Sequence, residues 1–226
     1  MKTNTVSTRG AAIVAVMIAV AISGIAAGYG IGTSTPAAAQ RTTTTTTPGA
    51  SAPYVVTLVI TTGNLFNSSI GDQPAYYLLG PSGLQSSAQI SLPAHQLIKL
   101  VIVNYDNGAA NLTDSKYAAV TGVVNNRIAI VNDTLVNSTM ASSGIQIRGV
   151  ENVSSLSTGA ISHTFTIPSL GINIPVAALS TEVAYFTLAT AGTFAWFCMT
   201  ICGSGAKGLG GAMATQGWMS GSVVVQ

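Results

Sequence analysis

From Tyr54 to the C-terminus the sequence consists of short β-prone runs separated by turn residues, and this pattern constrains the fold more than any other feature. Residues 54–61 (YVVTLVIT) and 97–104 (LIKLVIVN) are the clearest predicted strands. Further strands are predicted at residues 123–131, 182–188, 193–197 and 222–225. No long stretch after Tyr54 has helical periodicity, and Gly and Pro recur throughout. We therefore expect an all-β fold, either a β-sandwich or a barrel.

The chain is poor in charged residues, yet it does not have the composition of a disordered protein. Charged residues make up 6% of the sequence and hydrophobic residues 48%, whereas charged residues are roughly 25% of an ordinary globular protein. Thr, Ser, Asn and Gly must therefore provide most of the polar surface. The net charge of +2 comes from the N-terminal segment, because acidic residues outnumber basic ones after Arg41. Without a basic patch, nucleic acid is excluded as a partner.

An uncharged run rich in Ala, Ile, Val and Gly occupies residues 11–33. It is long enough to cross a bilayer as a helix. The preceding Lys2 and Arg9 predict a cytoplasmic N-terminus and an extracytoplasmic C-terminal part. We favour a permanent single-pass anchor at the cell membrane. Two alternatives remain open: a signal peptide cut after residues 37–39, and a segment resembling an archaeal pilin-type signal, cut after Arg9 or Gly10.

Residues 34–53 are rich in Thr, Ser and Pro and predict a disordered, extended tether between the anchor and the domain. Such a tract is also typical of O-glycosylation. Candidate N-glycosylation sequons follow at Asn67, Asn111, Asn132, Asn137 and Asn152. Together these features favour an exported glycoprotein. Most of the sequons fall in residues 107–160, which we interpret as a polar insertion with a hairpin of its own.

The residues suited to metal chemistry are concentrated near the C-terminus. Both cysteines of the chain, Cys198 and Cys202, lie there, together with His163 and Met219. Thiolate, imidazole and thioether groups are the ligand set that suits copper.

Two motifs in this region resemble a known family. Residues 161–171 (ISHTFTIPSLG) resemble the first histidine segment of the copper-A domain of cytochrome c oxidase subunit II, a cupredoxin. Cys198-x3-Cys202-Gly203 resembles the cysteine loop of that domain, and its distance from His163 is the family's usual spacing. The resemblance covers residues 92–106 and 161–225. It implies a Greek-key β-sandwich of the cupredoxin type.

The resemblance also implies a set of metal ligands. In this family the imidazole of His163 would bind copper, and Cys198 and Cys202 would bridge two copper ions. Met219 would be a weak thioether ligand, and the backbone carbonyl of Thr200 would stand at the family's carbonyl-ligand position.

One ligand of the family pattern is missing from this chain. In the alignment we prefer, residues 216–225 (QGWMSGSVVV) match the family's His-x-x-Met segment, so Gln216 stands where the second histidine is expected. An ungapped alignment instead places Ala206 at the histidine and Leu209 at the methionine. The second histidine is absent in both alignments. A site with one copper ion, a site with two, and a site without metal all remain open.

Each of these residues also has a purely structural interpretation. The cysteines could form a disulfide, which an oxidising exterior favours. His163 could be a hydrogen-bonded histidine at a strand edge, and Met219 an ordinary packing residue. We interpret the following residues as structural: His95, Trp196, Phe197 and Trp218.

The resemblance implies a membrane-anchored, extracytoplasmic copper protein for respiratory one-electron transfer, with an oxidase or another redox protein as partner. We expect an electron carrier rather than a stand-alone enzyme, because the sequence has no G-x-S-x-G element and no second histidine or carboxylate cluster. Subunit II of the common type has two transmembrane helices, so a single span favours a tethered partner. Two alternatives are a metal-free, cupredoxin-like surface glycoprotein with a Cys198–Cys202 disulfide, and a protein that delivers copper(I) to an oxidase.

Overall fold

The computed structural model describes residues 51–65, 73–133, 147–202 and 211–226. These residues form twelve β-strands and a few short 3-10 helices, with no α-helix among them. The predicted anchor at residues 11–33 lies outside the described ranges, as does nearly all of the tether. Within those ranges, no helix is long and apolar enough to span a membrane.

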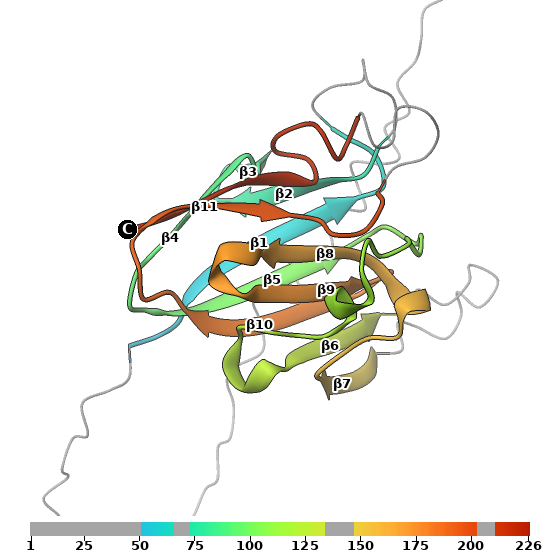
Figure 1. The fold of residues 1–226 in the computed structure, drawn as a ribbon, viewed down its shortest axis with the longest axis horizontal. Helices are drawn as coiled ribbons and strands as arrows, with labels where there is room; N and C mark the ends of the chain where they lie inside the picture. Colours follow the sequence, from blue (N-terminus) through green and yellow to red (C-terminus); the bar gives the residue numbers. More distant parts are fainter. Residues whose placement is uncertain (1–50, 66–72, 134–146, 203–210) are drawn as a thin grey trace, which may run out of the picture. The chain divides into compact units, whose positions relative to one another are not determined.

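Seven strands form the larger sheet, in the order β3-β2-β1-β5-β10-β6-β7 (Figure 1). At its centre β1 and β5 are parallel, and β5 and β10 are antiparallel. The strands are β1 (Tyr54–Thr61), β2 (Ala75–Gly80), β3 (Gly83–Ser86), β5 (Leu97–Asn104), β6 (Ile128–Asp133), β7 (Ile147–Val153) and β10 (Thr181–Thr187).

Five strands form the smaller sheet, in the order β4-β12-β11-β8-β9. Here β12 and β4 are parallel, and the other neighbours are antiparallel. The strands are β4 (Gln89–Leu92), β8 (Ile161–Ile167), β9 (Ile172–Ala177), β11 (Gly192–Phe197) and β12 (Ser220–Val225).

A single apolar core lies between the two sheets. Strand β5 alternates inward and outward residues along its whole length, as expected for a strand with one face on the core. The core contains large buried side chains from both sheets: Leu58, Ile60, Ile98, Leu100, Ile102, Phe165, Ile174, Trp196 and Val223. The prediction of an all-β sandwich is therefore confirmed.

The predicted strands agree with the structure to different degrees. Strands β1 and β5 have the predicted bounds, and β10, β11 and β12 differ by one or two residues at an end. The strand predicted at residues 123–131 is wrong in its first half, where a 3-10 helix, η3 (Val124–Asn126), precedes β6. Asn125 and Asn126 have φ values of 56° and 49°. Asn tolerates this left-handed conformation, which interrupts an extended strand.

The predicted polar insertion contains a hairpin, formed by β6 and β7, but this hairpin is not separate from the main fold. Strand β6 pairs with β10 and so extends the larger sheet. Another part of the insertion lies beside the smaller sheet, where Thr121 forms an isolated bridge with Asn173 of the edge strand β9. Strand β8, next to β9, is buried along its entire length.

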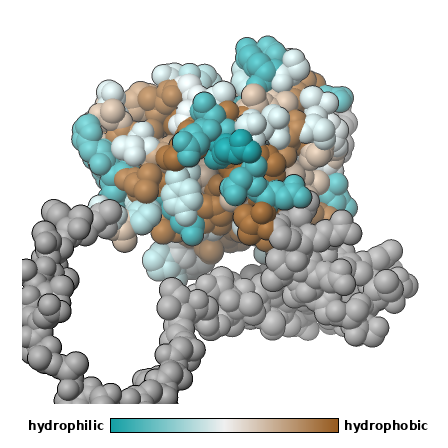
Figure 2. Space-filling view, turned by 90° about the horizontal axis from the view of Figure 1, so that it is seen from below, coloured by the Kyte–Doolittle hydropathy of each residue, from teal (hydrophilic) through white to brown (hydrophobic). Residues whose placement is uncertain are grey.

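The surface reflects the low charge of the chain. On the face seen in Figure 2, hydrophobic residues are interspersed with hydrophilic ones, and neither kind dominates.

Candidate metal centre

His163 reaches the interior from strand β8. The pairing register between β8 and β9 shifts between Ile161 and His163, and such irregularities re-aim side chains. His163 and Phe165 are two residues apart, so they point to the same side of the strand, toward the core. The imidazole is 1% exposed, and its ring stands edge-on to Tyr76, with ring centroids 6.1 Å apart. His163 is therefore a buried residue within a strand between two neighbours, not one at a sheet edge.

Both cysteines lie at the end of β11 and are buried. The N–H of Cys198 donates to the carbonyl of Met219, which is the last residue before β12, at 2.8 Å. The N–H of Cys202 donates to the carbonyl of Thr200 at 3.0 Å. The loop between the cysteines is also held by the insertion, because the N–H of Ile201 donates to the carbonyl of Asn111 at 2.9 Å.

His163, Cys198 and Cys202 converge at one point. Their ligand atoms all lie within 4.8 Å of one another. The Nδ1 atom of His163 is 3.0 Å from Sγ of Cys202 and 3.9 Å from Sγ of Cys198. The two sulfur atoms are 3.0 Å apart, and the two cysteines are not joined by a disulfide. The structure thus brings together two sulfur donors and one nitrogen donor.

The hydroxyl of Thr200 contacts both sulfur atoms. Its Oγ1 lies 3.0 Å from Sγ of Cys198 and 2.8 Å from Sγ of Cys202, and it donates to the carbonyl of Ser162 at 3.1 Å. The backbone N–H of Thr164 also donates to Sγ of Cys198, at 3.4 Å. The Thr164 N–H stabilises negative charge on the Cys198 sulfur, whereas the Thr200 hydroxyl hydrogen is already used by the Ser162 carbonyl.

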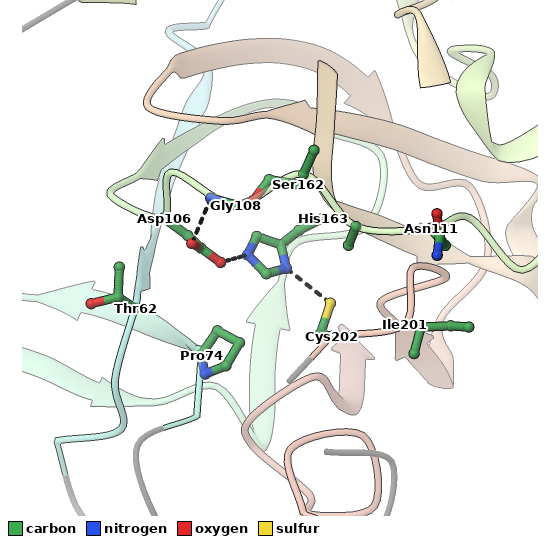
Figure 3. A pocket seen from close by; sticks show the side chains of 11 residues that line it. Thr62, Pro74, Asp106, Gly108, Asn111, Ser162, His163, Ile201 and Cys202 are labelled. Carbon is green, nitrogen blue, oxygen red and sulfur yellow. Dashed lines mark hydrogen bonds and ion pairs between the residues drawn. The ribbon is translucent and has the colours of Figure 1, made fainter. Parts of the chain in front are cut away.

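Asp106 contacts the opposite edge of the imidazole. Its Oδ2 lies 2.9 Å from Nε2 of His163, so the ring sits between a carboxylate and a sulfur atom (Figure 3). Asp106 follows β5 of the larger sheet, whereas His163 belongs to the smaller one. The pair therefore links the two sheets at the end of the sandwich.

These contacts shift the pKa values of all four groups. At His163 burial opposes the charged form, but the hydrogen bonds with Asp106 and Cys198 outweigh it and raise the pKa from 6.5 to about 9. At Asp106 burial acts in the opposite direction, yet the hydrogen bonds from His163 and Gly108 lower the carboxyl pKa. At Cys198 burial opposes the thiolate, but hydrogen bonds with Cys202 and His163 lower the thiol pKa well below its usual range. The hydrogen bond with Cys198, together with burial, raises the pKa of Cys202.

These shifts favour a charged imidazole at His163 and a thiolate at Cys198, whereas Cys202 holds its proton more strongly. Thiols and imidazolium groups lose their protons when they bind a metal ion, so metal binding at this site is coupled to proton release.

A cavity of about 490 Å³ opens beside the site. Its lining includes Asp106, His163 and Cys202 together with Thr62, Pro74 and Ile201 (Figure 3). The side chain of Ile201 is 44% exposed, although both cysteines are buried. Small species therefore have a route to the ligand atoms that does not pass through the core.

The other predicted ligands lie in different surroundings. Met219 is fully buried next to Cys198, and its carbonyl accepts the Cys198 N–H. The carbonyl of Thr200 is used by the Cys202 N–H. Gln216 is exposed and forms an isolated bridge with Ser220. Ala206 and Leu209, from the ungapped alignment, lie outside the described residues.

The residues interpreted as structural also differ from one another. Trp196 and Trp218 are buried, and Nε1 of Trp196 donates to the carbonyl of Ser87 at 3.2 Å. Phe197 is 41% exposed, so it is not a core residue. His95 precedes β5 with a φ of 58°, and its N–H donates to the carbonyl of Leu188.

Two participants in the site were missed by reasoning from the sequence: the carboxylate of Asp106 and the hydroxyl of Thr200. One feature of the sequence could have pointed to Asp106: it is one of only six acidic residues of the chain, and it follows the strand predicted at residues 97–104. Thr200 had been considered for its backbone carbonyl alone.

No protein-family model matches the sequence, and no curated protein matches it. Among solved structures the chain is similar to auracyanin B, at 13% identity and a TM-score of 0.32, over 78% of this chain and 91% of that one. It is also similar to the periplasmic domain of cytochrome oxidase subunit II of Bradyrhizobium japonicum, at 13% identity and a TM-score of 0.32, over 76% and 83%. Rusticyanin from Thiobacillus ferrooxidans follows at 12% identity and a TM-score of 0.28, over 76% of each chain.

Similarities of this size are too weak to carry an inference about function. The residues of the site are more specific, because the histidine and the two cysteines of the sequence motifs meet at one buried point. In these residues the chain resembles the cupredoxin family, and within it the copper-A domain of oxidase subunit II, with the second histidine ligand missing.

Proposed function

We propose that this protein binds copper at His163, Cys198 and Cys202 and transfers single electrons. The observation that carries this proposal is the convergence of one imidazole nitrogen and two sulfur atoms within 4.8 Å, in a buried position. Copper, when bound, supplies the one-electron redox change.

The donor set fits copper better than the other common metals. Soft thiolate ligands select copper(I), zinc or iron–sulfur clusters. Structural zinc sites and iron–sulfur clusters are typically held by four protein ligands. Among the described His, Cys, Asp and Glu residues, only these three form such a group.

We further propose that the site holds one copper ion rather than two. A dinuclear centre of the copper-A type needs a second histidine, and Gln216 at the corresponding position is exposed. The Thr200 hydroxyl oxygen also lies within hydrogen-bond distance of both sulfur atoms. Met219, next to Cys198, remains a proposed weak ligand.

The protein would contribute a fixed and water-poor setting. Both sulfur atoms are hydrogen-bonded, and the imidazole is held from both sides. Ligands that cannot move keep the reorganisation accompanying electron transfer small.

The cellular setting is proposed from the sequence alone. Residues 11–33 would anchor the chain in the cell membrane, and the Thr-rich tether would hold the copper domain outside the cytoplasm. The redox partner would be a respiratory oxidase or another redox protein. Sequons such as Asn111 and Asn152 would make the protein a glycoprotein.

Copper loading of the full chain in detergent tests the proposal. We expect one copper per chain and a strong sulfur-to-copper absorption band after oxidation. Replacing Cys198→Ser should weaken copper(I) binding by more than the roughly 100-fold that changes outside the ligand set can cost. Met213→Leu, which removes a sulfur atom outside the proposed ligand set, should bind copper as the wild type does.

Other outcomes would favour the alternatives. Two copper ions sharing one unpaired electron would indicate a dinuclear centre. Tight but colourless copper(I) binding without reversible oxidation would indicate copper delivery, for which a three-donor site is also suited. A wild type that takes up no copper and contains a Cys198–Cys202 disulfide would overturn the proposed function in favour of a metal-free surface protein.

A further inference from the structure

We propose that Asp106 is a positioning residue that fixes the orientation and tautomer of His163, so that Nδ1 faces the two cysteine sulfur atoms. As far as it concerns copper, this inference rests on the proposed function. The orientation itself is a property of the metal-free protein.

The first argument is the chemistry of the Asp106–His163 contact. A carboxylate can only accept a hydrogen bond, so the Nε2 atom at 2.9 Å must carry the proton. In a neutral imidazole the lone pair is then on Nδ1. The Nδ1 atom lies 3.0 Å from Sγ of Cys202 and 3.9 Å from Sγ of Cys198. Its lone pair is therefore directed to the proposed metal position.

The second argument is that Asp106 is itself held by several independent contacts. Its Oδ1 accepts the N–H of Gly108 at 2.9 Å. Its backbone N–H donates to Oδ1 of Asn104 at 3.0 Å, and its carbonyl accepts the N–H of Leu179 at 3.0 Å. The side chain is 18% exposed, in contrast to the exposed Asp114–Lys116 pair. Asp106 is thus preorganised in a way that surface ion pairs are not.

The third argument concerns Asn104, which connects Asp106 to the smaller sheet. Asn104 is the last inward-facing residue of β5, and its Nδ2 donates to the carbonyl of Ala177 at 2.7 Å, at the end of β9. Strand β9 pairs with β8, which carries His163. The carboxylate and the imidazole are therefore fixed to each other through the backbone as well as by their direct contact.

A partner that fixes the second nitrogen of a ligating histidine typically changes metal affinity by about 10–100-fold. For Asp106→Ala we expect a loss of copper(I) affinity in that range, measured by competition with a chromophoric chelator. The copper(II) electron spin resonance spectrum should also broaden, because the imidazole can then adopt more than one orientation.

Asp106→Asn provides the conservative variant. Its amide oxygen can still accept the Nε2–H, so it should recover part of the affinity and most of the sharp spectrum. Asp114→Asn is the matched control, because it removes one exposed carboxylate from the same part of the chain. It should bind copper as the wild type does.

A second measurement does not depend on copper. Nitrogen NMR of the metal-free chain, at a pH where the spectrum shows a neutral imidazole, should place the proton on Nε2 in the wild type and in Asp106→Asn. In Asp106→Ala it should show a mixture of tautomers. This result would support the positioning role even if the wild type bound no copper and the proposed function failed.

Two results would overturn the inference. One is a wild-type His163 that carries its proton on Nδ1. The other is an Asp106→Ala variant that remains folded by circular dichroism and binds copper with wild-type affinity and spectrum.

Discussion

The two sheets of the sandwich differ in how completely their neighbouring strands pair. In the larger sheet, β5 pairs with β1 and with β10 along nearly its whole length. In the smaller sheet, β11 pairs with β8 through a single position, Phe197 opposite Thr166. Strand β11 ends at Phe197, and Cys198 is the next residue of the chain. The metal site therefore begins where the hydrogen-bonded ladder of the smaller sheet ends.

Near the site, backbone N–H groups of β8 and of the cysteine loop form hydrogen bonds with side chains instead of with a neighbouring strand. The N–H of Thr164 donates to Sγ of Cys198, and the N–H of Met199 donates to Oγ1 of Thr164 at 2.7 Å. Thr166 donates its hydroxyl hydrogen to Asn173 at 2.7 Å, so the bond between the two threonine hydroxyls must be donated by Thr164. Asn173 then donates to two carbonyls of the insertion.

The two sheets are therefore held rigid by different interactions. The larger sheet is held by its ladder and by apolar burial. Around the site, a chain of side-chain hydrogen bonds replaces the ladder and ties β8 to the cysteine loop and to the insertion. Such a network is costly to interrupt, because each buried member then loses its partner.

The largest expected effect on stability is in the larger sheet. Leu100 lies in the middle of β5 and is 2% exposed. Leu100→Ala should lower the free energy of unfolding by about 2–5 kcal/mol, because it leaves a cavity in the core. The folded fraction should keep wild-type copper affinity, since the ladder around β5 remains. Urea unfolding and copper titration measure the two effects, and Val55→Ala, at a site 58% exposed, is the control. A loss of copper affinity without a loss of stability would contradict this separation.

In the smaller sheet, the Thr164→Val substitution should lower stability less than Leu100→Ala does, and it should affect the metal site more. Thr164→Val keeps the shape of the side chain but leaves the N–H of Met199 without its partner. We expect a cost of about 1–3 kcal/mol in urea unfolding. Because Met199 follows Cys198 directly, the visible spectrum of the copper form should shift as well. Thr193→Val, at an exposed position of β11, should change neither quantity. An unshifted spectrum in Thr164→Val would show that the network does not support the site.

The same contrast explains how much of the fold could be predicted from the sequence. Strands β1 and β5 are predictable because they combine β-branched residues with one apolar face. Strand β8 (ISHTFTI) is buried along its whole length, including its polar residues. Thr166 of this strand is linked through Asn173 to the carbonyls of Tyr117 and Ala119 in the insertion. Periodicity within β8 cannot reveal that contact.

The metal site was predictable to the extent that its residues belong to the two sequence motifs. The motif residues His163, Cys198 and Cys202 were expected to meet, and they do. Asp106 is 57 residues before His163 and on the other sheet, so only the packing of the two sheets brings it to the imidazole. The role of Gln216 as a ligand stays a prediction.

The smallest effect, about 1 kcal/mol for each pH unit, is expected at Glu182. Glu182 is a buried ionisable residue of the larger sheet. It lies on β10, and its Oε1 accepts the N–H of Ala177 at 2.6 Å and the hydroxyl of Ser180 at 3.2 Å. Among the described residues, its Oε2 has no hydrogen-bond partner. Burial raises the pKa of Glu182 from 4.5 to about 8, although the bonds from Ala177 and Ser180 oppose this.

The folded protein therefore keeps the Glu182 proton up to about pH 8, whereas the unfolded chain loses it near pH 4.5. Because the folded state then binds more protons, stability must fall as the pH rises through this window, by on the order of 1 kcal/mol per pH unit. Above pH 6.5 the raised pKa of His163 acts in the same direction, but the lowered pKa of its partner Cys198 acts against it. Glu182→Gln should remove the slope between pH 4.5 and 6.5, as measured by urea unfolding of the metal-free protein. Parallel pH profiles for the variant and the wild type would show that Glu182 is ionised in the folded state, and the regular sheet would then hold a buried charge as the site does.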